Sequence, residues 1–118
     1  MGVVDVVFHL ASRVGGIGVY RSDPFGVLSD NMIVDSNIIR ACIATNKPKF
    51  VYASTAHVYP ITLQDCLESP PLREEDAYPA DPMLTYGWSK LIGEKLLESS
   101  DLVHASARIL GAYGPGQD

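Results

Sequence analysis

The sequence predicts half of a doubly wound α/β fold, in which three parallel strands alternate with two helices. Three observations lead to this prediction. A Val-rich apolar run lies near the start of the chain, two long segments follow with apolar residues at helical spacing, and a shorter apolar run comes after each of them. The order strand, helix, strand, helix, strand requires crossover connections of one hand between parallel strands. We therefore expect one partial domain over residues 1–118.

The first half of the chain contains a strand and a helix. Residues 3–11 are nearly all apolar, which is typical of a strand buried on both faces. The sequence VGGIG at 14–18 ends this run. Residues 24–46 place apolar side chains on two stripes at helical spacing, so we expect this helix to be covered on two sides. Asn46 and Pro48 mark its end.

The second half repeats the alternation. Residues 49–54 predict a strand, and residues 60–82 predict a loop that holds five prolines. Residues 82–100 predict a helix, in which Pro82 is acceptable in the first turn. Residues 103–111 form a weaker third strand, because Ala and Ser are poor strand formers.

The predicted connections leave one face of the sheet uncovered. Two consecutive crossovers of the same hand, running in one direction, place both helices on the same side of the sheet. The opposite, Val-rich face then needs more chain or a partner to cover it.

The composition excludes several classes of function. The chain has 118 residues, 47% of them hydrophobic, and a net charge of -5, which argues against nucleic-acid binding. No apolar stretch approaches the length of about 20 residues of a membrane span. Residues 1–12 lack a basic start and carry Asp5 and His9, which argues against a signal peptide. Cys42 and Cys66 are expected to be reduced thiols of a cytoplasmic protein. They are not expected to form a metal site.

Tyr86 and Lys90 are the strongest chemical signal. They stand four residues apart in the second predicted helix, so their side chains share one face. An ammonium beside a phenol favours the phenolate and lowers its pKa, which would produce a base able to take a proton from a sugar hydroxyl. For an isolated Tyr-x-x-x-Lys motif, the alternative of an ordinary surface pair would be favoured.

Five segments place this motif in a wider context. They are VVFHLAS (6–12), DNMIVDSNIIRAC (30–42), KFVYASTAHVYP (49–60), TYGWSK (85–90) and ARILGAYGPGQ (107–117). In this order they resemble the extended short-chain dehydrogenase/reductase family of NAD-dependent nucleotide-sugar epimerases and dehydratases. The resemblance implies the fourth to sixth strands of a Rossmann domain. The sequence VGGIG and the Pro60 that follows Val-Tyr are similar to the branch of GDP-mannose 3,5-epimerase and GDP-fucose synthase.

The resemblance implies a role for each matching residue. Tyr86 would be the base that oxidises the sugar, Lys90 would lower its pKa and bind the nicotinamide ribose, and Thr55 would hydrogen-bond the reacting hydroxyl. His57 stands where relatives place the second acid or base, and a histidine suits that task at neutral pH. The alternative for His57 is a polar spacer.

The resemblance also implies the binding residues of a nucleotide-sugar enzyme. Gly15 and Gly16 would help to hold the sugar. The cofactor is expected to be NAD, with NADP as an alternative, and the partner a second copy of the chain bound through the two helices. The residues expected to border the cofactor, besides Tyr86 and Lys90, are Ala11, Ser12, Asn31 and Ser54.

Some features depart from the family pattern. The family's first three strands and its sugar-binding domain have no counterpart in the chain, and Gly111 stands where the family has an asparagine. We therefore expect a fragment that binds NAD weakly or not at all and is inactive by itself. The alternative to an enzyme fragment is a non-catalytic module, whose bare sheet face and open edge dock to another chain. His9, in the first predicted strand, is expected to be structural.

Overall fold

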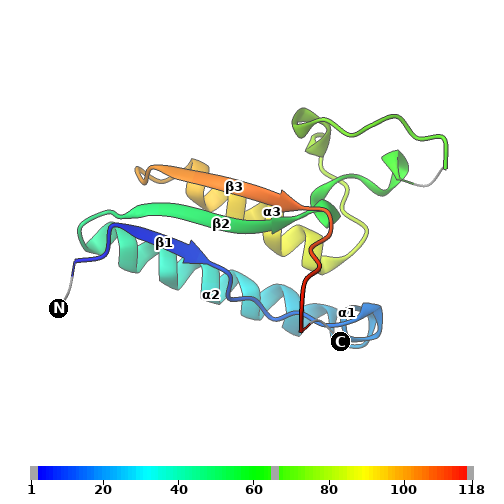
Figure 1. Ribbon diagram of the computed structural model, residues 1–118. Helices are drawn as coiled ribbons and strands as arrows, with labels where there is room; N and C mark the ends of the chain where they lie inside the picture. The colour runs from blue at the N-terminus through cyan, green and yellow to red at the C-terminus, as the bar shows by residue number, and fades with distance from the viewer. Residues whose placement is uncertain (1–2, 65–66, 117–118) are drawn as a thin grey trace.

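The computed structural model describes residues 3–64 and 67–116, so the prediction for Cys66 lies outside the described residues. The three predicted strands are present and form one parallel sheet in the order β1-β2-β3 (Figure 1). Short 3-10 turns, η1 to η3, connect β2 to the last helix. In chain order the elements are β1 (Val6–His9), α1 (Ile17–Ser22), α2 (Pro24–Ala44), β2 (Lys49–Thr55), η1 (Ala56–Val58), η2 (Ile61–Leu63), η3 (Glu74–Ala77), α3 (Thr85–Glu98) and β3 (His104–Ile109).

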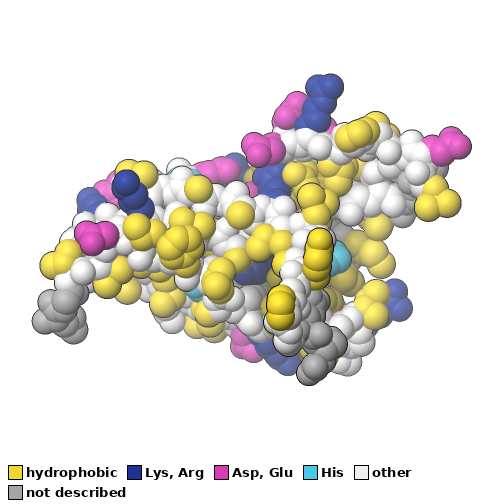
Figure 2. All heavy atoms as spheres, viewed as in Figure 1, with side chains coloured by type: hydrophobic (Ala, Val, Ile, Leu, Met, Phe, Trp, Pro, Cys, Tyr) yellow, Lys and Arg dark blue, Asp and Glu magenta, His cyan; other side chains and the backbone are white. Residues whose placement is uncertain are grey.

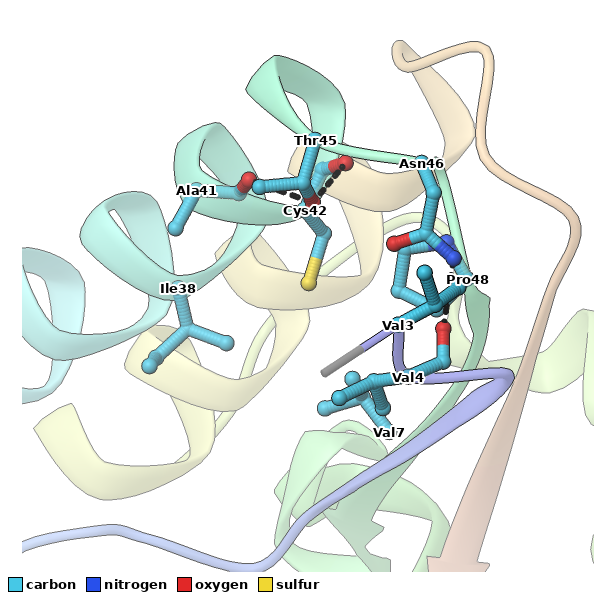
Figure 3. Close-up of a pocket in the computed structure, with 9 residues that line it drawn as sticks. All are labelled: Val3, Val4, Val7, Ile38, Ala41, Cys42, Thr45, Asn46 and Pro48. Carbon is cyan, nitrogen blue, oxygen red and sulfur yellow. Dashed lines mark hydrogen bonds between the residues drawn. The ribbon is translucent and has the colours of Figure 1, made fainter. Parts of the chain in front are cut away.

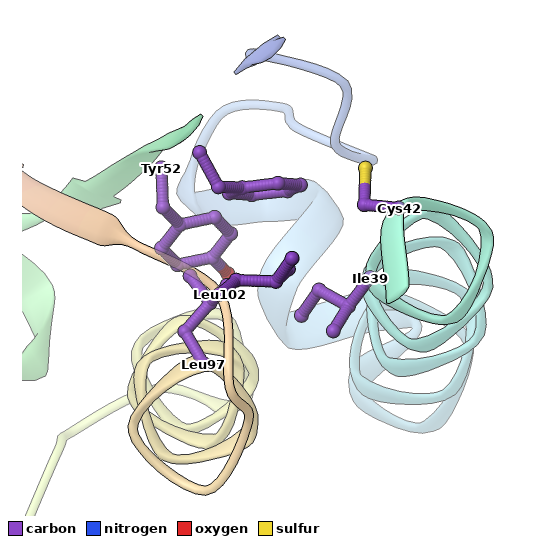
Figure 4. Packing of buried hydrophobic residues seen from close by; sticks show 6 residues of the cluster. Ile39, Cys42, Tyr52, Leu97 and Leu102 are labelled. Carbon is purple, nitrogen blue, oxygen red and sulfur yellow. The ribbon is translucent and has the colours of Figure 1, made fainter. Parts of the chain in front are cut away.

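Both long helices lie on the same face of the sheet, as expected from the crossovers (Figure 1). The alternation of side chains along β2 turns Phe50 and Tyr52 towards these helices. Around them forms the main hydrophobic core, and Figure 4 shows how its side chains converge between β2, α2 and α3. Its buried members are Ile39, Cys42, Phe50, Tyr52, Leu97 and Leu102.

Helix α2 begins with a defined cap. The Asp23 carboxylate accepts a hydrogen bond from Gly26 N at 2.9 Å, and Pro24 occupies the first helical position. The helix buries a single stripe rather than the two stripes expected, and two of the buried side chains are polar. The buried residues of α2 are Val27, Asn31, Asp35, Ile39 and Cys42.

Helix α3 begins at Thr85, three residues later than predicted, so Pro82 precedes the helix instead of lying in its first turn. Two glycines let α3 lie close to its neighbours. A β-carbon at Gly87 would collide with the carbonyl oxygen of His57, and one at Gly93 would collide with the hydroxyl of Tyr52. Gly87 and Gly93 therefore fix how near the helix comes to η1 and to β2.

The other face of the sheet carries no helix in the described residues. Phe8, Val51 and Ala105 lie side by side across the three strands in register, and the Phe8 side chain is 69% exposed. Leu10, beyond the end of β1, is 72% exposed. Figure 2 shows hydrophobic side chains gathered over the strands on this face. The expectation of an uncovered apolar face is confirmed.

Helix α1 was not expected from the sequence, because residues 15–18 contain three glycines, which are unfavourable in helices. The loop at 60–82 contains η2 and η3, which have no periodic pattern to reveal them. None of the helices in the described residues is long and apolar enough to cross a membrane.

Candidate active site at the carboxyl ends of the strands

Tyr86 lies half-buried in the first turn of α3, between two aromatic neighbours. Its ring stacks on that of Tyr20 from α1, with ring centroids 5.0 Å apart and an angle of 8° between the planes. The ring of His57, in η1, meets Tyr86 edge-on at a centroid distance of 6.0 Å. Two segments that are distant in sequence from Tyr86, α1 and η1, thus contact its ring.

The approach of α3 to η1 depends on Gly87, the residue after Tyr86. Any larger side chain there would strike the His57 backbone. Thr55, the last residue of β2, is buried, and its hydroxyl accepts a hydrogen bond from His57 N at 3.3 Å. The structure therefore places Thr55 next to His57, and His57 next to Tyr86, at the end of the sheet where ligands of such folds bind.

The pKa of Tyr86 is raised, chiefly because burial of the ring disfavours the phenolate, with further contributions from Tyr20 and from the charge of Asp35. This is contrary to the lowering expected from an adjacent ammonium. The reason lies in the position of Lys90, whose Nζ lies over the ring of Tyr52, 4.8 Å from its centroid. Burial lowers the pKa of Lys90, and the charge of Asp35 partly offsets that effect.

Beneath Lys90 lies a buried polar cluster that sequence reasoning missed. Asp35 Oδ1 is 2.7 Å from His9 Nε2, and Asp35 Oδ2 accepts a hydrogen bond from the Tyr52 hydroxyl at 2.6 Å. All three side chains are buried. His9 is therefore structural, as expected. A possible signal was the spacing of Asn31 and Asp35, four residues apart and in line with the buried apolar positions of α2.

The Asn31 side chain of α2 forms hydrogen bonds with the loop after β1 and with α3. Its Oδ1 accepts hydrogen bonds from Ser12 Oγ at 3.0 Å and from Arg13 N at 2.6 Å. Its Nδ2 donates to Arg13 O at 3.1 Å and to Ser89 Oγ at 3.4 Å. The amide of Asn31 is therefore engaged with the chain itself and fixes the position of Ser12, while Ala11 is exposed beside it.

Ser54 belongs to a second polar cluster. Its hydroxyl donates to Glu94 Oε1 at 2.5 Å. Arg108 of β3 binds the same carboxylate, with Nη2 at 2.7 Å from Oε2 and Nε at 3.0 Å from Oε1. A further Arg108 bond, from Nη1 to the Glu74 carbonyl at 2.6 Å, ties the loop after β2 to the sheet. The Ser54 hydroxyl is therefore engaged with Glu94 in this structure.

The two glycines predicted to hold a sugar lie next to Tyr20. Gly15 N donates a hydrogen bond to the Tyr20 hydroxyl at 3.2 Å, and Gly16 is the N-cap of α1. Both residues are exposed. They border the Tyr86 site through Tyr20 rather than by direct contact with Tyr86.

A sequence profile described as the NAD dependent epimerase/dehydratase family matches residues 2–118. The chain belongs to this family. Over 93 residues it is 38% identical to GDP-mannose 3,5-epimerase of Arabidopsis thaliana. This match covers 79% of this chain and 25% of the relative. GDP-L-fucose synthase of Escherichia coli (strain K12) is 28% identical, over 95% of this chain and 36% of the relative.

Solved structures of the family share the fold. A UDP-N-acetylglucosamine 4-epimerase from Methanobrevibacter ruminantium superposes with a TM-score of 0.79 at 27% identity, covering 97% of this chain and 36% of the other. A UDP-glucuronic acid 4-epimerase from Bacillus cereus, in complex with UDP-glucuronic acid and NAD, gives a TM-score of 0.75 at 28% identity, covering 96% and 35%. The chain thus spans about a quarter to a third of the length of these family members.

The structure also has a pocket away from the Tyr86 site. At the opposite end of the sheet, an apolar pocket of about 450 Å³ lies between the start of β1 and the end of α2 (Figure 3). No group of three or more metal-ligating side chains occurs in the described part of the chain. The pocket is lined by Val3, Val4, Val7, Ile38, Ala41, Cys42, Thr45, Asn46 and Pro48.

Proposed function

We propose that this chain carries the oxidation site of an NAD-dependent nucleotide-sugar epimerase or dehydratase. The observation that carries the proposal is the convergence of Thr55, His57 and Tyr86 at the carboxyl end of β2, with Lys90 one helical turn further along α3. The membership of the family and the NAD in related structures support it.

Lys90 provides the test of whether the residues present fit the cofactor. The buried ammonium carries three donor hydrogens, and within the described residues it lies over the Tyr52 ring rather than beside a carboxylate. These donors can bind ribose hydroxyls, so the residues fit the nicotinamide end of NAD. When bound, NAD would accept a hydride from the sugar carbon.

The roles of the other residues follow from their positions. Tyr86 takes the proton of the reacting sugar hydroxyl through its phenol oxygen, and Thr55 holds that hydroxyl by a hydrogen bond. Tyr86 can take this proton only as the phenolate. Because burial raises its pKa, the phenol would release its own proton to solvent only once the positively charged nicotinamide of NAD is bound beside it. His57 is exposed next to the ring, where it can exchange a proton at a carbon next to the new ketone.

Binding is tested on the 118-residue chain itself. Because the chain spans only part of its relatives, we expect NAD to bind weakly or not at all. NMR shifts at millimolar NAD that are confined to the surroundings of Lys90 and Tyr86 would support the proposal. NADP serves as the competing cofactor. Shifts confined to other parts of the chain would contradict the proposal.

Because the isolated chain is expected to be inactive, chemistry is tested with GDP-mannose and NAD in deuterium oxide on a GDP-mannose 3,5-epimerase whose matching segment is replaced by residues 1–118. We expect His57→Ala to abolish deuterium incorporation at the sugar carbons while reduction of NAD continues, and Tyr86→Phe to abolish both. His104→Ala is the matched control, because this histidine bonds the Leu102 carbonyl, away from the site. Deuterium incorporation that survives in His57→Ala would show that His57 is only a spacer.

A second candidate function is favoured by the bare sheet face. Val6, Phe8 and Leu10 expose a large apolar surface along β1, which suits docking to another chain. We expect Phe8→Asp to reduce self-association in sedimentation experiments. Leu67→Asp, which changes an exposed leucine in the loop after β2, should not. A stable oligomer that does not respond to NAD would favour this assembly module over the enzyme.

Two further expectations belong to the proposal. A homodimer through α2 and α3 is supported by apolar side chains that remain on the outer sides of these helices, namely Phe25, Met32, Ile33 and Trp88. A cytoplasmic location is supported by Cys42, which is a free and buried thiol whose pKa is raised by burial.

A further inference from the structure

The cluster of His9, Asp35 and Tyr52 lies directly beneath the proposed active site. The two oxygens of Asp35 are divided between its neighbours, with His9 Nε2 at 2.7 Å and the Tyr52 hydroxyl at 2.6 Å. The ring of His9 also stacks on that of Tyr52, at a centroid distance of 5.7 Å. Asp35 is 1% exposed and Tyr52 is fully buried, so water does not compete for these bonds.

Lys90 occupies the other side of this cluster. Its Nζ lies over the face of the Tyr52 ring, 4.8 Å from the centroid, and the residue is 2% exposed. Burial of an ammonium away from a carboxylate is costly unless other groups compensate. The ring of Tyr52 is the compensating group, because the face of an aromatic ring attracts a cation within about 6 Å.

We propose that Asp35 is a positioning residue of this enzyme site, which holds the Lys90 ammonium in place by binding the hydroxyl of the Tyr52 ring on which that ammonium rests. The inference rests on the proposed function, since it assigns Asp35 a role only through Lys90. A phenol that donates a hydrogen bond to a carboxylate has a more electron-rich ring than a free phenol. The hydrogen bond therefore strengthens the attraction between ring and ammonium, and the charge of Asp35 adds to it.

The packing of α3 keeps this arrangement in register. A β-carbon at Gly93 would strike both the Tyr52 hydroxyl and the Asp35 carboxylate, so only glycine lets α3 approach the cluster. Lys90 lies one turn before Gly93 on the same helix. The close approach of α3 thus positions the ammonium over the ring and the carboxylate behind it.

Several charged or titratable groups act on this site, and their effects must be separated. His9 faces it from β1, Asp35 from α2 and Tyr52 from β2. Tyr86 and Glu94 act from α3, on which Lys90 itself lies. The hydrogen bond between the Tyr52 hydroxyl and the Asp35 carboxylate is the interaction that the proposal invokes, so these two residues are the ones to change.

The experiment follows the ε-carbon of Lys90 by NMR through a pH titration of the full chain, without cofactor or substrate. We expect Asp35→Asn to shift the titration midpoint of Lys90 to lower pH, because it removes the anion but keeps an amide that can bond His9 and Tyr52. Tyr52→Phe keeps the ring and removes its bond to Asp35, so we expect a smaller shift in the same direction.

Lys95 offers a matched control within the same spectra. Its Nζ lies 4.9 Å from the ring centroid of Tyr78, an exposed counterpart of the Lys90 pair, and 2.7 Å from the Glu98 carboxylate. Neither variant should move the midpoint of Lys95, and Tyr78→Phe should leave the midpoint of Lys90 unchanged. A purely structural role for Asp35 would lower stability without moving the midpoint of Lys90.

The results decide the inference in each case. An unmoved Lys90 midpoint in folded Asp35→Asn overturns it; if that variant does not fold, the midpoint in Tyr52→Phe decides in the same way. In the unmodified chain, the ε protons of Lys90 must show the upfield shift of a group above an aromatic ring, and its absence also overturns the inference. Because no step uses NAD, this result is independent of the binding and exchange tests of the proposed function.

Discussion

The rings of Tyr20 and Tyr86 are stacked, with centroids 5.0 Å apart and planes at 8° to each other. This contact buries the phenol proposed to be the catalytic base, and Tyr20 is one of the groups that raise its pKa. We therefore expect Tyr20→Leu to lower the pKa of Tyr86 towards that of a free tyrosine. NMR titration of the phenolic carbon of each tyrosine measures the change.

Tyr113 supplies the control for this prediction. Its side chain is 97% exposed, so Tyr113→Leu should leave the titration of Tyr86 unchanged. A Tyr86 pKa that is equal in Tyr20→Leu and in the parent chain would show that the stack has no influence on the base.

Gly87→Ala should destabilise the chain, because the new β-carbon would meet the carbonyl oxygen of His57. Relief of such a clash costs about 1–3 kcal/mol in the free energy of unfolding. The same displacement would separate Tyr86 from His57 and weaken their nuclear Overhauser contacts. Denaturation with urea measures the first effect and NMR the second.

Gly18→Ala is the matched control on another helix. A β-carbon at Gly18 has no atom within 4 Å, and alanine favours helix over glycine by about 1 kcal/mol. This variant should be as stable as the parent chain or more stable. Equal effects of the two substitutions would refute the argument from close packing.

Arg108→Met should be strongly destabilising, since it leaves the buried Glu94 carboxylate without its bidentate partner. Removal of one partner of a buried pair costs about 3–5 kcal/mol. Arg40→Met changes an exposed arginine and should alter the free energy of unfolding by no more than about 0.5 kcal/mol. Similar losses in the two variants would mean that the Arg108 pair contributes little.

Stability should fall at alkaline pH because burial, and then the bond to Asp35, raises the pKa of Tyr52. In the unfolded chain this tyrosine ionises near its ordinary pKa of about 10, whereas the folded chain retains the proton. The unfolded state therefore binds fewer protons above that pH, and the free energy of unfolding declines as pH rises. The contribution of Tyr52 is fully present below about pH 10.

The test compares the slope of unfolding free energy against pH, from urea denaturation between pH values below and above this range. Tyr52→Phe should show a shallower decline than the parent chain. Tyr113→Phe should match the parent, since that ring is exposed in the folded chain as well. A Tyr52→Phe slope as steep as that of the parent would contradict the assignment.

The sequence predicted those parts of the structure that follow from periodicity and residue order. The parallel alternation of strands and helices and the uncovered face behind Phe8 are confirmed. Spacing placed Tyr86 and Lys90 on one helix, but it could not show that Lys90 rests on Tyr52 rather than beside Tyr86. That detail depends on tertiary contacts between β2 and α3.

The buried face of α2 shows a second limit of pattern reasoning. Apolar stripes were the signal, yet Asn31 and Asp35 occupy two of its buried positions. A polar residue is buried when a partner satisfies it, and the partners here, Ser12 and His9, lie far away in sequence. Helix α1 was missed for a local reason, because Gly18 within it has low helix propensity and two more glycines come directly before it.

Gly87 has a consequence for how such sites are recognised in other sequences. In the motif Tyr-x-x-x-Lys, the position after the tyrosine is written as open to any amino acid. In this chain it is not open, because the backbone of His57 occupies the space that a side chain at Gly87 would need. A search that required a small residue at this position would select chains whose tyrosine can stand beside a residue such as His57, and would discard many that match the motif by chance.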